Sequence, residues 1–392
     1  MVMPPETGKR TPPGQMELVA AILMGGLGIT QVVAMPLLAT LIASAFQIEG
    51  ADSGLIGLAN LLGTALGSLI VTIWLHHLPL RRTVIVSALI AVAAQIAVAV
   101  MAGFTGIILL EAVSGIGAGV LIALSAAIVG ASANPDRGFA FILTLQAGVA
   151  VLVLLVIPVL AEAYSLLEVM IFLASTQALL IPVGLTMRYG PIAEKALKTS
   201  EASGSPVQAS ILLRAASYFV FSAAVGVLWV FSGILGSMAE IDDAPLGHAL
   251  AFGNVAAIAG SLLAAIITSR FGRISPILAV CLTLALSALL FAADMTLIQF
   301  YLASSLFLFA WGGGLPLLMG SVAAADATDR VTSLLPVLAF AGMGVGPALV
   351  GIVPGSSGLF QQVSYTTIGL VALAFCLLVS AHTVARLRKG LG

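Results

Sequence analysis

Charged residues are scarce in this chain of 392 residues, where Asp, Glu, Lys and Arg together make up 8%. A soluble globular domain carries roughly 25%. Hydrophobic residues make up 60% of the sequence. A water-soluble fold could not cover this much apolar surface, because its exterior would become one continuous apolar patch. The composition therefore excludes a soluble globular protein and indicates a protein that crosses a membrane several times.

Cysteine is nearly absent, and charge of one sign does not dominate. Cys281 and Cys376 both lie within apolar runs, which excludes a disulfide framework and a cysteine metal site. The formal net charge of −1 provides no basic surface for nucleic acid. The "GIGAG" at 115–119 follows no strand, so it is not a nucleotide-binding loop. No nucleophile–base set is recognisable, and we expect neither a cofactor nor an enzymatic activity.

Long apolar runs are what the sequence has in abundance. About 20 apolar residues suffice to cross a bilayer as a helix, and these runs are too long for the alternating strands of a membrane barrel. A helix bundle also satisfies every backbone polar group internally. We predict an all-α membrane protein with twelve transmembrane helices at 17–45, 53–76, 83–102, 106–131, 138–161, 165–187, 211–238, 246–268, 274–293, 295–322, 331–354 and 364–385.

The distribution of charge over the predicted loops gives an orientation. With twelve spans, all fifteen Lys and Arg residues fall on the side of the chain termini or at helix ends that face it. The charged residues in the opposite loops are all acidic, among them Asp52, Glu162, Asp243 and Asp294. Because positively charged loops stay in the cytoplasm, we expect both termini there. The short polar tail at the N-terminus is not a signal peptide, and we expect the protein in a bacterial inner membrane.

The predicted spans divide into two groups of six. The loop "YGPIAEKALKTSEASGSPVQAS" follows the sixth span, and basic turns recur at the same places in each group. Such recurrence indicates two pseudo-symmetric six-helix halves. We therefore expect a cytoplasmic tail, an N-terminal half, a cytoplasmic linker, a C-terminal half and a second tail at 1–16, 17–188, 189–210, 211–386 and 387–392.

This plan resembles the major facilitator superfamily over nearly the whole chain. The family carries a motif of the form G-x-x-x-D-R-x-G-R-R/K after spans two and eight. "AIITSRFGRIS" keeps Arg270 and Arg273, whereas "IWLHHLPLRRT" keeps only Arg81 and Arg82. The resemblance implies that these basic turns help to hold a cytoplasmic gate, and the alternative is that they only anchor the topology. The predicted gating residues are Arg81, Arg82, Arg137, Arg270, Arg273 and Arg330.

Two further stretches are similar to the drug/proton antiporter group of that family. Span four, "LLEAVSGIGAGVLIA", matches the R-x-x-x-G-x-x-x-G pattern at Gly115 and Gly119, with Glu111 in place of the arginine. Span eleven contains "GMGVGPALVG", which is similar to the antiporter G-x-x-x-G-P signature. That signature normally lies in span five, which is related to span eleven by the pseudo-symmetry. The resemblance implies alternating access and coupling to protons.

Glu111 is the one acidic residue predicted to lie clearly within a span. A carboxylate in hydrocarbon is costly, so it must face a wet cavity, find a partner or hold a proton. We interpret Glu111 as a proton-coupling residue or as the counter-charge of a cationic substrate. The alternative is a glutamate near a helix end that reaches outward to water.

Neutral polar and aromatic residues within the spans are candidates for substrate binding. Buried amides either bond between helices or line a pathway, and aromatic rings can stack on a flat substrate or attract a cation. In the family the central cavity is lined by spans one, four, seven and ten. Gln177, in span six, is expected to be structural, and Arg214 is either a snorkelling arginine or a contact for an anion. The predicted substrate-binding residues are Gln31, Asn60, Gln146, Arg214, Trp229, Asn254 and Trp311.

The stretch "WGGGLP" in span ten is a predicted hinge at Gly312, Gly313, Gly314 and Pro316. Glycine and proline weaken the helical hydrogen-bond ladder, and interrupted helices at the midplane are where transporters bind and bend. Glycine also permits close helix contact, which is the alternative interpretation.

Together these features predict a secondary transporter that exports a small amphipathic or cationic compound in exchange for protons. The alternative is uptake or facilitated diffusion of a small neutral or weakly acidic metabolite. We expect the partners to be a small-molecule substrate, protons and the lipid bilayer, with no nucleic acid and no bound metal, and we expect a monomer.

Overall fold

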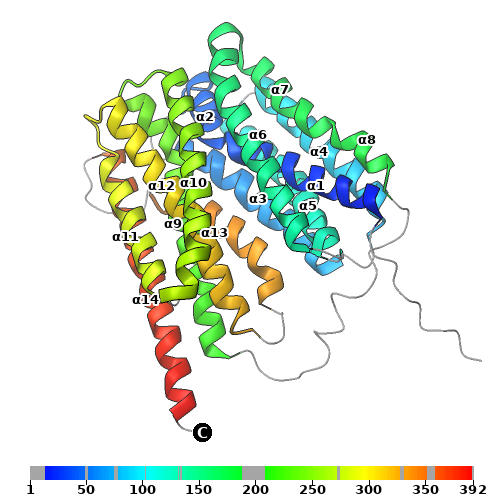
Figure 1. The fold of residues 1–392 in the computed structure, drawn as a ribbon. Helices are drawn as coiled ribbons and strands as arrows, with labels where there is room; N and C mark the ends of the chain where they lie inside the picture. The colour runs from blue at the N-terminus through cyan, green and yellow to red at the C-terminus, as the bar shows by residue number, and fades with distance from the viewer. Residues whose placement is uncertain are drawn as a thin grey trace, which may run out of the picture.

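The computed structural model describes residues 14–48, 52–74, 78–101, 103–130, 132, 135–187, 208–271, 274–326, 331–350 and 358–390. Within these ranges the chain is helical throughout, and Figure 1 shows the helices packed into one bundle. The helices of the first half are α1 (Gln15–Leu27), α2 (Thr30–Ala45), α3 (Ser53–Trp74), α4 (Leu80–Val100), α5 (Phe104–Gly130), α6 (Pro135–Ala163), α7 (Leu166–Ala178) and α8 (Leu180–Leu185). Those of the second half are α9 (Ala209–Met238), α10 (Asp243–Phe271), α11 (Ile274–Leu290), α12 (Leu297–Ala323), a 3₁₀ turn at Thr332–Leu334, α13 (Leu335–Leu349) and α14 (Leu359–Gly390).

Each of the twelve predicted spans coincides with helical structure. Ten spans in the described ranges are long and apolar enough to cross a membrane. The two shorter apolar helices, Ile274–Leu290 and Leu335–Leu349, lie where the ninth and eleventh spans were predicted. The predicted fold class is therefore confirmed, since long apolar runs determine helices of this kind directly.

Spans one and six are each interrupted once, although each still counts as one membrane span. Span one is divided at Gly28 and Ile29 into α1 and α2, and span six is divided at Leu179 into α7 and α8. In span six the cause is local, because Pro182 has no N–H for the carbonyl four residues earlier. In span one the interruption follows the glycine-rich "MGGLG", and side chains from other helices bind the carbonyls exposed there.

In the first half, α3 and α5 pack with their backbones in contact. A Cβ on Gly63 or Gly67 would collide with the carbonyl oxygens of Ala112 and Ile116 on α5. In return, a Cβ on Gly115 would collide with the carbonyl oxygen of Asn60. Glycine spaced by four on both helices is what permits this approach. The close packing fixes the distance between Asn60 and Glu111, which lies one turn before Gly115.

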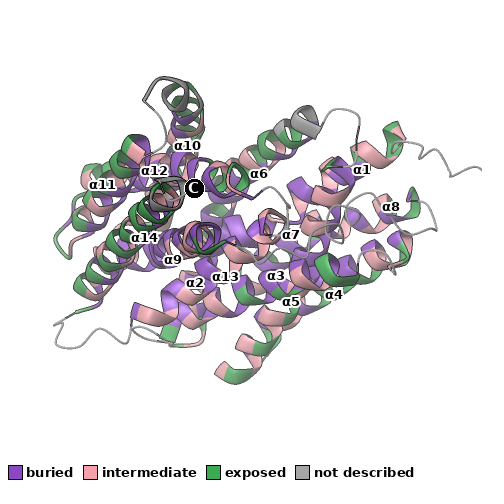
Figure 2. Ribbon diagram, turned by 90° about the horizontal axis from the view of Figure 1, so that it is seen from below, coloured by how far each residue is buried: buried purple, intermediate pink, exposed green. Residues whose placement is uncertain are grey.

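In the second half, α9 is the central helix. It packs against α12, α13 and α14 and also reaches α2 of the first half. Its residues from Phe221 to Gly236 are all buried, and Figure 2 shows that buried residues gather on the sides of the helices that face the interior of the bundle. The two halves meet where α2 lies against α9, α3 against α13, and α6 against α10. We call these three contacts the seam.

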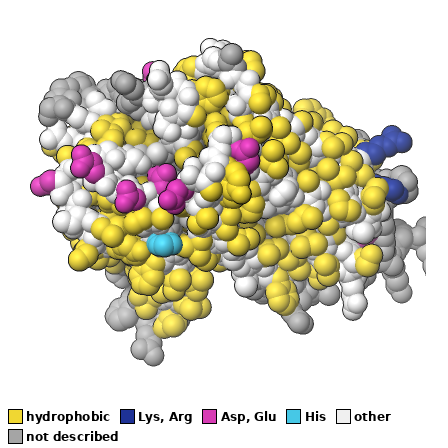
Figure 3. Space-filling view, turned by 90° about the horizontal axis from the view of Figure 1, so that it is seen from above, with side chains coloured by type: hydrophobic (Ala, Val, Ile, Leu, Met, Phe, Trp, Pro, Cys, Tyr) yellow, Lys and Arg dark blue, Asp and Glu magenta, His cyan; other side chains and the backbone are white. Residues whose placement is uncertain are grey.

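Charged side chains are separated on the surface. In Figure 3, acidic side chains gather on one part of the face shown, and basic side chains lie at the opposite edge. Residues 189–207 of the predicted linker 189–210 lie outside the described residues. So do residues 1–13 of the N-terminal tail and residues 391–392 of the C-terminal tail. Arg273 and Arg330 also lie outside the described residues, and the side chains of Arg137 and Arg270 are not described.

Candidate functional site

Glu111, Gln31 and Asn60 come together from three different helices. Gln31 on α2 donates from Nε2 to Oε2 of Glu111 on α5 at 2.8 Å. Asn60 on α3 donates from Nδ2 to the same oxygen at 3.1 Å and to the backbone oxygen of Glu111 at 3.4 Å. All three side chains are fully buried. We call this group the carboxyl site; sequence analysis selected each member but could not predict that they bond to one another.

The carboxyl site is asymmetric. Ser114 on α5 donates to Oε1 of Gln31, which leaves the amide nitrogen of Gln31 directed at Glu111. Oε2 of Glu111 therefore accepts two hydrogen bonds, whereas Oε1 of Glu111 and Oδ1 of Asn60 are buried with no hydrogen-bond partner among the described residues. The alternative of a glutamate that reaches outward to water is wrong in this conformation, because Glu111 is 0% exposed.

A buried carboxyl group with only neutral donors is chemically informative. An ionised carboxylate away from water is very costly unless it is paired with a cation. The donors that reach Glu111 from the described residues are amides. The neutral acid satisfies this environment better, because its proton removes the net charge.

The carbonyl groups of α1, and those at its break from α2, are bound by side chains of other helices. Ser125 donates to the oxygen of Ala21 at 2.6 Å, and Gln146 donates to that of Gly25 at 2.9 Å. At the break, Gln177 donates to the oxygen of Gly28 at 3.2 Å. The last carbonyls of a helix have no partner within it, so the donors to Gly25 and Gly28 stabilise the interruption.

Gln146 and Gln177 therefore have their amide nitrogens engaged within the first half. Gln146 was a predicted substrate-binding residue, and in this conformation its amide donates to the backbone of α1. Gln177 also accepts from Gln95 at 2.7 Å, so two buried amides on α4 and α7 form a pair. Asn254 bonds to the oxygen of Leu250 in its own helix.

Three aromatic rings form a cluster in the second half. Trp229 on α9 and Trp311 on α12 meet edge to face with ring centroids 5.0 Å apart. Phe307 stacks on Trp311 at 5.9 Å. Trp229 is 1% exposed, whereas Trp311 is half-buried. Of these rings, Trp311 has the accessible surface that stacking on a flat molecule would require.

The indole nitrogen of Trp229 links the aromatic cluster to the first half. It donates to the carbonyl oxygen of Val32 on α2 at 2.7 Å. Val32 directly follows Gln31, the residue that donates to Glu111. The carboxyl site and the aromatic cluster are thus joined by one turn of α2 across the seam.

Arg214, near the start of α9, is half-buried and donates to the oxygen of Ser321 on α12 at 3.4 Å. This bond lies within the second half. Of the predicted gating residues, Arg81 and Arg82 have described side chains at the start of α4, where Arg81 is half-buried and Arg82 is exposed.

The predicted hinge in α12 is a continuous helix in this conformation. Pro316 has no N–H to offer the carbonyl of Gly312, and the hydroxyl of Ser261 on α10 donates to that oxygen at 2.6 Å. A Cβ on Gly312 would collide with the oxygen of Ala257. The glycines thus allow close contact between α10 and α12, and hinge bending stays a prediction.

Among the buried polar residues that sequence analysis did not select, Ser114 and Asp326 stand out. Ser114 orients Gln31 in the carboxyl site, but a serine in a glycine-rich helix carries no distinctive signal. Asp326, after α12, accepts from the backbone nitrogens of Val331 and Thr332 at 2.8 and 2.9 Å. These nitrogens lie five and six residues after Asp326, beyond the reach of a local cap, so no capping pattern in the sequence marks it. In the described ranges, His, Cys, Asp and Glu form no group of three that could hold a metal ion.

No protein-family model and no curated protein sequence matches this chain. Solved structures do match it. The peptide transporter PepTSo of the POT family superposes with a TM-score of 0.74 at 9% identity, covering 97% of this chain and 100% of that one. The chain has the major facilitator fold. The nucleoside transporter NupG, as its D323A mutant, gives 0.70 at 14% identity, with 94% and 99% covered.

A bacterial homologue of the human lysosomal transporter Spinster, in an inward-facing and unoccupied conformation, gives a TM-score of 0.64 at 15% identity, with 94% and 95% covered. These matches extend over nearly the whole of each chain. At such low identity the likeness shows the major facilitator fold and no more.

Proposed function

We propose that this protein is a secondary transporter of the major facilitator type that works by alternating access and exports a small amphipathic or cationic compound in exchange for protons. Glu111 carries the proton. The observation that supports this role is the carboxyl site, in which a fully buried acid has amide donors on one oxygen and no partner on the other. Such a group gains by being neutral when the site is closed and can ionise when water reaches it.

The aromatic cluster supports the proposed substrate class. Trp311 is half-buried beside Trp229 and Phe307, and rings of this kind bind flat or cationic molecules through their faces. The proteins with matching structures include carriers of nucleosides and peptides by name, so the major facilitator fold serves several substrate classes.

The proposed orientation places both termini in the cytoplasm of a bacterial inner membrane. The described basic residues Arg81, Arg82, Arg214 and Arg386 lie toward the helix ends on that side, and the acidic residues Glu162, Glu240 and Asp294 lie toward the other. Arg81 and Arg82, with Arg137, Arg270, Arg273 and Arg330, are proposed to hold the cytoplasmic gate. We propose the residue ranges 17–188 and 211–386 as the two moving halves.

The second candidate function is uptake or facilitated diffusion of a small neutral or weakly acidic metabolite. It is favoured by the half-buried Arg214, which can bind an anionic group. In that case Glu111 is structural. Gln31 and Asn60 then offer little to a substrate, because their amide nitrogens already serve Glu111.

A ligand-induced thermal-shift screen on the purified protein separates these functions. The panel contains lipophilic cations, neutral sugars and nucleosides, amino acids and aromatic carboxylates, each tested on the wild type and on Glu111→Gln. Export coupled to protons predicts a cation that stabilises the wild type, and substrate-driven proton movement in proteoliposomes that the variant lacks. Stabilisation by a neutral or anionic metabolite, unchanged in Glu111→Gln, would instead support uptake.

A further inference from the structure

One polar contact across the seam uses a backbone carbonyl that proline has released. Pro36 lies within α2 and has no N–H, so the carbonyl of Val32, four residues earlier, has no helical donor. The indole N–H of Trp229 occupies the vacant position at 2.7 Å. A side chain of one half thus completes the hydrogen-bond ladder of a helix in the other half.

The backbones of α2 and α9 also touch one turn further along. A Cβ on Gly233 would collide with the carbonyl oxygen of Pro36. Because Gly233 follows Trp229 by four residues, both contacts lie on one face of α9. The two helices therefore meet closely from the middle of the bundle toward the end where α2, α6 and α9 finish. We call this the distal end; it lies away from the chain termini (Figure 1).

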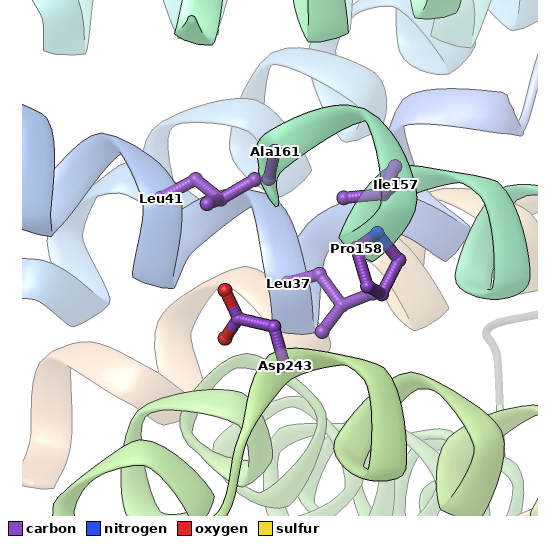
Figure 4. A pocket seen from close by; sticks show the side chains of 6 residues that line it. All are labelled: Leu37, Leu41, Ile157, Pro158, Ala161 and Asp243. Carbon is purple, nitrogen blue, oxygen red and sulfur yellow. The ribbon is translucent and has the colours of Figure 1, made fainter. Parts of the chain in front are cut away.

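A second proline-released carbonyl lies at the seam between α6 and α10. Pro158 leaves the oxygen of Leu154 without a helical donor, and a Cβ on Gly247 of α10 would collide with that oxygen. Beside it is a recess lined by five apolar residues, Leu37, Leu41, Ile157, Pro158 and Ala161, and by Asp243 (Figure 4). The recess gathers residues of α2, α6 and α10, so mainly apolar side chains surround the released carbonyls at the distal end of the seam.

A comparable pair lies wholly inside the second half. Pro316 releases the oxygen of Gly312, and Ser261 donates to it. As with Val32 and Trp229, a side chain donates to a carbonyl that a proline has released. This bond joins α10 to α12 within the second half and does not cross the seam. It supplies a matched control for any effect of removing a donor to a released carbonyl.

We propose that Trp229 is a positioning residue for alternating access: its hydrogen bond to the Val32 carbonyl, which Pro36 releases, closes the distal end of the seam and breaks when that end opens. The proposal rests on the alternating-access part of the proposed function. Water that enters on opening can satisfy the released carbonyl, so the bond is exchanged at a modest cost. The contact is thus strong enough to favour closure and weak enough to be reversible.

The position of Val32 gives this closure contact a route to the carboxyl site. Gln31 and Val32 are adjacent, so the segment that Trp229 holds also carries the amide donor of Glu111. When Trp229 leaves, that turn of α2 loses its restraint from the second half. Opening of the distal end therefore changes the position of Gln31, the residue next to Val32, and so alters its hydrogen bond to Glu111.

The test measures opening of the distal end in the purified full chain. A Leu41→Cys probe is introduced after replacement of Cys281 and Cys376 by alanine, and its reaction rate with a soluble maleimide is followed without substrate or pH gradient. Trp229→Phe should raise the rate about 2- to 10-fold, the range expected for one net hydrogen bond. Pro36→Ala should also raise it, because the new N–H at position 36 competes for the Val32 carbonyl.

The double variant decides between a hydrogen bond and a simple loss of packing. With Pro36→Ala present, Trp229→Phe should change the rate less than 2-fold, since the carbonyl already has a helical donor. Ser261→Ala should leave the rate unchanged. An unchanged rate in Trp229→Phe, or equal increases in both backgrounds, would overturn the proposal. If Trp229→Phe fails to fold, Pro36→Ala alone still tests it, and an unchanged rate there overturns it as well.

Failure here can be told apart from failure of the proposed function. The labelling assay needs no transport, and the proton role of Glu111 is tested separately by Glu111→Gln. Suppose that Glu111→Gln loses substrate-driven proton movement but Trp229→Phe leaves the labelling rate unchanged. This outcome would reject the closure role of Trp229 and keep the proton role of Glu111. Labelling as expected with no proton coupling would remove only the proton role.

Discussion

The side chain of Gln31 bridges two residues of α5, donating to Glu111 at 2.8 Å while accepting from Ser114. Because both ends of the amide are engaged, its orientation is fixed, and Glu111 always meets a donor rather than an acceptor. Ser114 therefore influences Glu111 through Gln31, because its hydroxyl determines which end of the Gln31 amide faces the carboxyl group.

Ser114→Ala is expected to weaken the carboxyl site without removing any of its three members. The buried oxygen of Gln31 loses its donor, which should lower the free energy of unfolding by about 1–3 kcal/mol. The amide can then rotate and present its oxygen to Glu111, so proton-coupled transport should fall more than stability alone explains. Thermal unfolding and proton flux in proteoliposomes measure the two effects.

Ser44→Ala is a suitable control, since Ser44 is exposed and bonds only to the carbonyl of Leu41 in its own helix. It should change neither quantity. Wild-type proton flux in Ser114→Ala would show that the amide of Gln31 does not need this restraint.

Gly115→Ala should be strongly destabilising. The new methyl group would meet the backbone oxygen of Asn60, which cannot move without separating α3 from α5. Overpacking of this kind costs about 1–3 kcal/mol or more, and it should also move Asn60 away from Glu111. Gly148→Ala in α6 is the matched control, because a Cβ there meets nothing within 4 Å. Equal melting temperatures for both variants would contradict the close packing of α3 and α5.

The buried amide pair of α4 and α7 predicts an order of effects. Gln95→Leu leaves the oxygen of Gln177 without a donor. Gln177→Leu leaves the amide nitrogen of Gln95 without an acceptor and, in addition, the carbonyl of Gly28 without a donor at the break in span one. Gln177→Leu should therefore lower the melting temperature more than Gln95→Leu. The reverse order would mean that Gln177 does not stabilise the break between α1 and α2.

The proposed orientation predicts which surface residues can be labelled from outside the cell. In a cysteine-free background, Asp294→Cys should react with a membrane-impermeant maleimide in intact bacteria, and Arg386→Cys should react only after permeabilisation. Both positions are exposed, so accessibility depends on sidedness alone. Labelling of Arg386→Cys in intact cells would reverse the assignment.

The twelve spans could be predicted because hydrophobic run length determines a membrane helix almost by itself. The interruption at Gly28 and Ile29 could not, since it is stabilised by Gln177 and other side chains that lie far away in the sequence. Likewise Glu111, Gln31 and Asn60 were each recognisable as polar residues in apolar spans. Their mutual contact depends on how α2, α3 and α5 pack, which a single sequence does not encode locally.

Trp229 illustrates the same limit from another side. Its place in span seven suggested a surface for substrate, but the structure shows its N–H bonded to a carbonyl that exists as an acceptor only because Pro36 follows Val32 by four residues. Trp229 and Pro36 were both visible in the sequence. Their relation could be recognised only once the fold showed that α2 and α9 are in contact.

The bonds that hold span one are directed at its carbonyl oxygens, at Ala21, Gly25, Gly28 and Val32, and not at its side chains. Every residue type carries the same oxygen, so substitutions at these four positions that respect size and helix geometry keep the acceptor intact. The donors Ser125, Gln146, Gln177 and Trp229 have no such freedom. A deep mutational scan of this protein should therefore find that donor chemistry is required at four positions on four other helices, whereas the four acceptor positions in span one are constrained by the space around them.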